Sequence, residues 1–133
     1  MIDIGSNSYS PLTLAFLGDT VYDLLVRSDI ISQANRPVKD LHALASSKVC
    51  ASAQAQAVKA ILPLLSEEES EIFKRGRNAH PGSTPKNQSG QDYHYATGLE
   101  CLFGKLWLDG RHDRINELYN IIKESCDGNE KTG

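Results

Sequence analysis

Apolar residues recur at steps of three and four positions along most of this 133-residue chain. Leu14, Leu17, Val21 and Leu25 are one example, because residues at this spacing share one face of a helix. No stretch alternates between apolar and polar residues over a useful length, so the pattern predicts no strand. The sequence therefore predicts an all-α fold. The helices that we expect cover about residues 10–31, 37–62, 66–77, 92–108 and 111–125.

Residues that begin or end helices stand at the borders of these segments. Ser10 and Pro11 suit a helix start, and Pro63 ends or bends the alanine-rich second helix. Ser66 and Glu69 have the spacing of a capping box. A long connection over about residues 78–91 follows, and loops of that length in compact domains are often functional.

Length and composition limit the classes of protein to which this chain can belong. With 40% apolar and 23% charged residues, the chain can form one domain with a core, which we place at residues 9–126. We expect flexible termini at 1–8 and 127–133. No apolar run approaches the roughly 20 residues that a membrane helix needs, so we expect no membrane partner.

Charge and cysteine content narrow the class further. The net charge of −3 argues against a uniformly basic nucleic-acid binder, although a local basic patch remains compatible with it. The three cysteines are an odd number without metal-type spacing, which argues against a disulfide scaffold. A reducing compartment such as the cytosol is therefore expected.

Asp19 is an acid in the middle of an apolar helix, within the sequence LAFLGDTVY. A buried carboxylate costs several kcal/mol unless it is paired or bound to a cation. The adjacent Gly18 weakens the helix by about 1 kcal/mol relative to alanine, but it would let a ligand or another backbone approach closely. Asp23 follows one turn later on nearly the same face and could support the same site. The alternative is that Asp19 faces solvent at the edge of the apolar stripe.

Glu100 is a second acid in the same kind of setting, within the sequence ATGLECLFG. If the two helices pack together, Asp19 and Glu100 can converge on one hard cation. Magnesium prefers oxygen ligands and keeps several waters, so two carboxylates are enough to hold it. The sequence therefore predicts a magnesium site, and two unrelated surface acids are the alternative.

The segment of residues 72–91 contains no acid and carries four cations. These are Lys74, Arg75, Arg77 and Lys86, accompanied by small polar residues such as Asn78. Cations supply affinity for a phosphate backbone, and small donors position it, so the segment suits nucleic acid. A solvated loop after a helix end whose dipole favours cations is the alternative.

Other chemistry-bearing residues are weaker candidates. The doublet of His112 and Asp113 resembles the metal doublet of helical phosphohydrolases, but partner histidines are hard to place. A surface histidine at the start of a helix explains it better. We found no Ser-His or Cys-His arrangement that would supply a nucleophile.

Several stretches resemble the ribonuclease III catalytic domain. Residues 16–21 (FLGDTV) are similar to its signature helix, and residues 95–100 (YATGLE) are similar to its second acidic motif. The resemblance is closer to the Mini-ribonuclease III branch, on residues 19–27, 48–55 and 75–79 and the PKN at 85–87. It covers roughly residues 9–122.

This resemblance implies an all-α endonuclease domain that forms a homodimer and cleaves double-stranded RNA with magnesium. Asp19 and Glu100 would be the metal-binding and catalytic acids, with Asp23 in support. The residues that we expect to bind RNA are Lys48, Arg75, Arg77, Asn78 and Lys86.

Known properties of the branch also imply a substrate. Mini-ribonuclease III enzymes are associated with maturation of the large-subunit (23S) ribosomal RNA precursor, and a ribosomal protein is a further candidate partner. The polar tail after Ser125 predicts no second RNA-binding domain, as in this branch.

The chain departs from the larger ribonuclease III enzymes at two positions. Those enzymes carry further acids where this chain has Ala15 and Thr97. Fewer oxygen ligands therefore remain, which leaves the number of metal ions open. Two other functions stay open from the sequence: a non-catalytic dimer that binds structured RNA during ribosome assembly, and a helical nucleotide phosphohydrolase built on His112.

Overall fold

The structure, a computed structural model, describes residues 9–79 and 90–132, and every regular element within these ranges is a helix. The predicted all-α fold is confirmed. The elements are α1 (Pro11–Gln33), α2 (Val38–Val49), α3 (Ala51–Ile61), the short 3-10 helix η2 (Leu62–Leu64), α4 (Glu67–Asn78), α5 (Gly90–Leu108) and α6 (His112–Thr132). Among these helices, none has the length and apolar character that crossing a bilayer requires.

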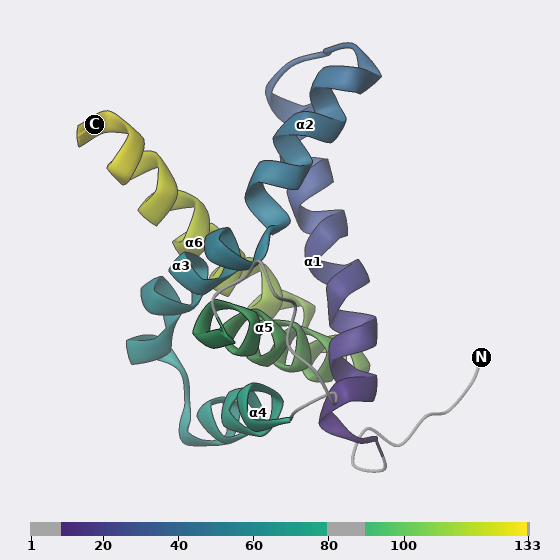
Figure 1. The fold of residues 1–133 in the computed structure, drawn as a ribbon, viewed down its shortest axis with the longest axis vertical. Coiled ribbons are helices and arrows are strands. Elements are labelled where there is room, and N and C mark those ends of the chain that lie inside the picture. Colours follow the sequence, from purple (N-terminus) through teal and green to yellow (C-terminus); the bar gives the residue numbers. More distant parts are fainter. Residues whose placement is uncertain (1–8, 80–89, 133) are drawn as a thin grey trace.

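Helix α5 lies at the centre of the molecule, and α1, α3, α4 and α6 all pack against it (Figure 1). Its residues 96–106 are buried, with the single exception of Glu100, which is part-buried. Leu99, Leu102 and Phe103 are 0% exposed and form the middle of the core. Each such side chain stabilises the fold by about 1.5–3 kcal/mol. A charged residue on this helix is therefore surrounded by neighbouring helices.

Glycines let α1 and α5 approach until their backbones touch. A Cβ atom added at Gly18 would lie 1.6 Å from the carbonyl oxygen of Glu100, and one added at Gly104 would lie 2.0 Å from that of Leu14. No side chain fits at either position. Gly18 therefore permits the close backbone approach that the sequence suggested, and it fixes where α1 crosses α5.

The boundaries differ from the predicted ones in the second helix. The single helix expected over residues 37–62 is broken at Cys50, whose backbone is extended with ψ of 160°. The two parts pack against different partners, α2 against α1 and α3 against α5 and α6. Tertiary packing therefore overrides the continuous helix propensity of the alanine-rich sequence.

The last helix is longer than predicted. We expected it to end near residue 125, but the backbone of α6 continues to Thr132. The intervening sequence contains helix-forming glutamate and lysine, no proline, and one glycine that costs only about 1 kcal/mol.

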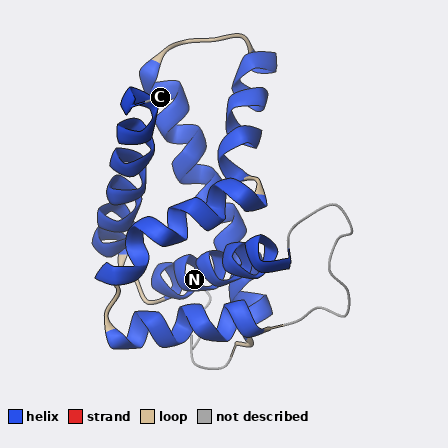
Figure 2. Ribbon diagram, turned by 60° about the vertical axis from the view of Figure 1, so that its left-hand side comes forward, coloured by secondary structure: helices blue, strands red, loops and turns tan. Residues whose placement is uncertain are grey.

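Helices α1 and α2 run side by side and are joined by the short connection at the top of Figures 1 and 2. Helix α6 packs against α3 (Figure 1). Helices α1 and α3 both pack against α5, so the centre of the molecule is enclosed by helices from both halves of the sequence.

Candidate active site

The two acids singled out in the sequence are neighbours in the structure. Asp19 follows Gly18 on α1, and Glu100 lies on α5 at the point where the two backbones touch. The carboxyl group of Asp19 is close enough to share a hydrogen bond with that of Glu100 and to act on its charge. The crossing of α1 and α5 therefore builds a carboxylate pair.

The two members of this pair differ in exposure. Asp19 is exposed. The sequence left open whether it is buried among its apolar neighbours or faces solvent at the edge of the apolar stripe, and the structure shows that it faces solvent. Glu100 is part-buried. The pair is therefore open to solvent at Asp19 and shielded at Glu100.

The environment of Glu100 favours its neutral form. Burial, followed by the negative charge of Asp19, raises the pKa of Glu100 from 4.5 to about 8. A hydrogen bond from the side chain of Gln54 acts in the opposite direction but is outweighed. At neutral pH, the carboxyl group of Glu100 therefore keeps its proton unless a positive charge comes close.

The pair fits a hard divalent cation. Within residues 9–79 and 90–132, no three side chains of His, Cys, Asp or Glu are grouped so as to hold a metal ion. Two carboxylates are nevertheless enough for magnesium, because that ion keeps most of its water ligands. A cation between Asp19 and Glu100 would favour the charged form of Glu100, against the burial and the negative charge of Asp19 that raise its pKa.

Gln54 is a site residue that the sequence analysis missed. It lies in the first turn of α3, is only 2% exposed, and hydrogen-bonds to Glu100. A signal for it was present, because Gln54, Val58 and Ile61 are spaced to share one face, and the latter two belong to the core. A polar residue on the buried face of a helix needs a partner, and here that partner is Glu100.

Asp23, which the sequence suggests as a supporting residue of the site, has an ion-pair partner on its own helix. It forms an ion pair with Arg27 one turn later, with 3.0 Å between Oδ2 and Nε. The negative charge that acts on Glu100 comes from Asp19. The structure therefore pairs Asp23 with Arg27, and a supporting role for Asp23 at the site stays a prediction.

The residues expected to bind RNA lie on several elements. Lys48, at the end of α2, is part-buried and lines a cavity of about 200 Å³ together with Tyr22 and Asp29. Lys86 lies outside the described residues. The structure therefore does not gather all of these residues into one described surface.

The basic residues of α4 point in different directions. Arg75 is exposed and lines a hollow of about 330 Å³ next to Cys101 of α5. Arg77, two residues later, lies over the ring of Phe73 at 6.0 Å and donates a 3.2 Å hydrogen bond to Asn78 Oδ1. Residues two apart on a helix do not share a face, so Arg75 and Arg77 belong to separate parts of the surface.

The weaker candidates are accounted for by packing. His112 stacks on Trp107, with ring centroids 4.5 Å apart, at the start of α6. All three cysteines are free, and Cys101 is buried in the core, where burial raises the pKa of its thiol to about 11. Neither group has the setting of a catalytic centre.

A comparison with protein families identifies the class. The model of the ribonuclease III domain matches residues 12–111, a range that includes both members of the carboxylate pair. A crystal structure of a protein from Fusobacterium nucleatum has the same fold, with a TM-score of 0.81 and 31% identity over 89% of this chain and 94% of that one. The fold and the family therefore define an endoribonuclease of the ribonuclease III type.

Individual relatives narrow this to one branch. The chain is 48% identical over 117 residues to Mini-ribonuclease 3 of Thermoanaerobacter sp., which covers 88% of this chain and 82% of that protein. It is 44% identical over 112 residues to Mini-ribonuclease 3 of Brevibacillus brevis, covering 84% of each. The chain belongs to the Mini-ribonuclease III branch of the ribonuclease III family, as its motifs suggested.

Proposed function

We propose that this protein cleaves double-stranded RNA with the help of magnesium and matures the precursor of large-subunit (23S) ribosomal RNA. Its membership of the ribonuclease III family supports the action on duplex RNA. The observation that carries the proposal is the carboxylate pair, in which Asp19 is open to solvent and the pKa of Glu100 is raised to about 8. Such a pair is unfavourable without a cation and suited to one.

Asp19 and Glu100 would hold the magnesium ion. When bound, such an ion activates water and neutralises charge on a scissile phosphate. Glu100 would release its proton as the cation binds, and Asp19 would face the RNA from the exposed side of α1. Asp23, held by Arg27, would support α1 one turn away.

Phosphate contacts would come from Lys48, Arg75, Arg77, Asn78 and Lys86. Of the described residues in this set, Arg75 and Asn78 are exposed, and Lys48 and Arg77 are part-buried. Proteins recognise duplex RNA mainly through its shape and its 2′-hydroxyl and phosphate groups, so we expect modest sequence preference. Because phosphate contacts release counterions, binding should weaken steeply as salt rises.

We also propose that the protein acts as a homodimer. Phe16 is 83% exposed, and Leu12 and Leu24 on the same helix are 38% and 56% exposed. A large aromatic side chain that is open to water on a helix is typical of a surface that another chain covers. The proposed substrate also suggests a ribosomal protein as a further partner and the bacterial cytoplasm as the location, with the plastid stroma as the alternative.

Cleavage of a long RNA duplex, with and without magnesium, tests the function. Asp19→Asn and Glu100→Gln should each abolish cleavage while the circular dichroism spectrum stays helical. His112→Ala is the control and should cleave normally, because His112 packs on Trp107. Normal cleavage by Asp19→Asn or Glu100→Gln would refute the site, and loss of activity in His112→Ala would instead favour a phosphohydrolase.

A further inference from the structure

The side chain of Gln54 presents a problem that packing does not explain. It is 2% exposed, lies in the first turn of α3, and is followed on the same face by the buried Val58 and Ile61. The neighbouring Ala53 and Ala55 are small and apolar. An apolar side chain would be the simplest occupant of such a position, so the amide needs its own reason.

Only one half of that amide is satisfied. Its N–H group donates a hydrogen bond to the carboxyl group of Glu100. Its oxygen, Oε1, is buried and has no hydrogen-bond partner among the residues that the structure describes. A buried acceptor without a partner destabilises the fold, because it has lost its hydrogen bonds to water. The interaction with Glu100 is therefore what distinguishes glutamine from an apolar residue of the same size.

The contact between the Gln54 amide and Glu100 suits an acid that must stay available to bind a cation. A lysine or arginine at the same place would neutralise Glu100 permanently and compete with a cation. A neutral amide can orient the carboxyl group without cancelling its charge. Since Gln54 belongs to α3, Glu100 is held between two helices, with Asp19 on α1 and Gln54 on α3.

We propose that Gln54 is a positioning residue, which holds the Glu100 carboxylate in the orientation that binds the divalent cation together with Asp19. This inference rests on the proposed function, because it assumes that the carboxylate pair binds a cation. Gln54 touches neither substrate nor reacting atoms in this account and acts only through Glu100. Partners that orient metal ligands in this way typically contribute about 10- to 100-fold to metal affinity.

The test uses Gln54→Met, which keeps the length and the helix propensity of the side chain but removes the amide. Gln56→Met is the matched control, because Gln56 lies two residues further on the same helix and is exposed. The full chain is titrated with Mn²⁺, and electron paramagnetic resonance measures the concentration of free ion. This gives the affinity for Mn²⁺ independently of RNA cleavage. Manganese prefers the same oxygen ligands as magnesium.

We expect Gln54→Met to bind Mn²⁺ about tenfold more weakly, with Gln56→Met unchanged. Its kcat for duplex cleavage at a fixed magnesium concentration should fall while its KM for RNA stays the same. Its Tm without metal should be equal to or above that of the wild type, since an unpaired buried oxygen has been removed.

Two results would overturn the inference. Equal Mn²⁺ affinity in Gln54→Met and wild type would show that the amide does not position Glu100. A lowered Tm with unchanged metal affinity would show that Gln54 only supports the fold. If wild type and Glu100→Gln bind Mn²⁺ equally, the proposed metal site itself is wrong, and the role of Gln54 is refuted with it.

Discussion

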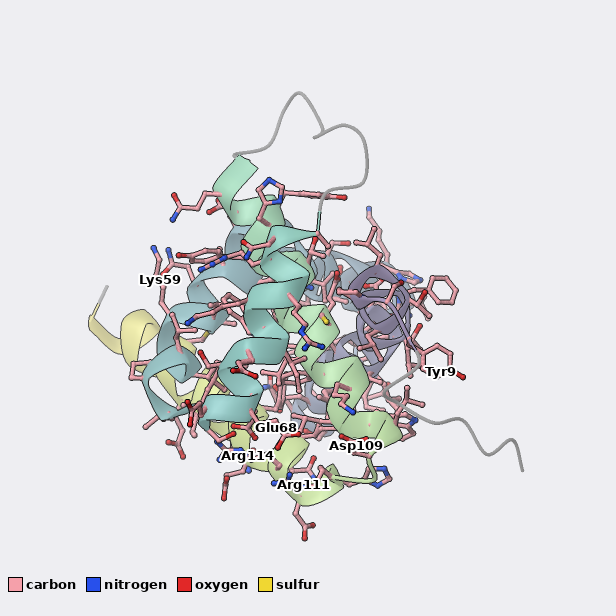
Figure 3. All side chains as sticks on the ribbon, turned by 90° about the horizontal axis from the view of Figure 1, so that it is seen from below. Tyr9, Lys59, Glu68, Asp109, Arg111 and Arg114 are labelled. Carbon is pink, nitrogen blue, oxygen red and sulfur yellow. The ribbon has the colours of Figure 1, made fainter. Side chains whose placement is uncertain are left out.

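Two shielded glutamates in this protein have opposite environments. Glu69, in the first turn of α4, is 5% exposed and receives two 2.9 Å hydrogen bonds from Arg114, from Nε to Oε2 and from Nη2 to Oε1. Ser66 adds a further hydrogen bond from its backbone N–H. Arg114 lies beside this end of α4 in Figure 3. Glu100 instead faces the carboxyl group of Asp19 and the neutral amide of Gln54.

The ionisation of the two groups follows from these partners. The Arg114 guanidinium holds the pKa of Glu69 below its usual range, whereas burial and Asp19 raise the pKa of Glu100 to about 8. Glu69 has its counter-charge within the chain, so it ties α4 to α6. Among the described residues, those that act on the pKa of Glu100 include no cation, so a bound cation could balance its charge. An acid that the fold leaves unbalanced is a better candidate for function than one that the fold has paired.

The largest expected effect is on catalysis. Glu100→Gln should reduce duplex cleavage roughly a thousandfold, because one of two metal-binding carboxylates is lost. Glu69→Gln should cleave at the wild-type rate when assayed well below its melting temperature. Gel analysis of fragments measures both. A comparable loss of activity in the two variants would remove the distinction between the two glutamates.

The glycine beside the acid pair should matter next. Gly18→Ala would place a methyl group against the carbonyl of Glu100, forcing α1 and α5 apart. We expect a loss of about 3 kcal/mol in the free energy of unfolding and a strong loss of cleavage. Gly90→Ala is the control, since a Cβ there meets no atom of the described part of the chain within 4 Å. Urea unfolding measures the stability of both variants, and equal stabilities would contradict the close crossing.

Breaking the ion pair between Glu69 and Arg114 should lower the free energy of unfolding by a smaller amount. Glu69→Gln removes the charge that Arg114 needs, although Arg114 keeps Glu117 and the carbonyl oxygen of Leu64 as partners. We expect a loss of about 2 kcal/mol in the free energy of unfolding, measured at neutral pH. This stabilisation is present above pH 4.5 and disappears as pH falls through the lowered pKa of folded Glu69. A variant as stable as wild type would show that the pair contributes little.

The smallest effect is the pH dependence of the metal-free protein. Because the pKa of Glu100 rises from 4.5 to about 8 on folding, the folded state binds more protons between these values. Stability should therefore fall as pH increases across this window. Glu100→Gln should remove that slope and gain about 1 kcal/mol at pH 8, after allowance for solvent screening. Thermal melts in the presence of a chelator measure it, and parallel curves for the two proteins would contradict the raised pKa.

Much of the fold could be predicted from the periodicity of apolar residues, since α1, α4 and α5 follow it closely. The break at Cys50 could not, because it depends on α2 and α3 packing against different helices. The acid pair could be predicted from the sequence, because Asp19 and Glu100 interrupt apolar stretches next to glycines. The part played by Gln54 was harder to see, because whether a glutamine in an alanine-rich helix is buried depends on the helix that covers it.

Calorimetric titration of the protein with magnesium at pH 7, in two buffers of different ionisation enthalpy, tests the central claim most directly. If Asp19 and Glu100 together hold the ion, the wild type should bind one or more ions and release close to one proton, because Glu100 begins protonated. Glu100→Gln should bind weakly and release none. Binding of equal strength without proton release in both proteins would contradict the account.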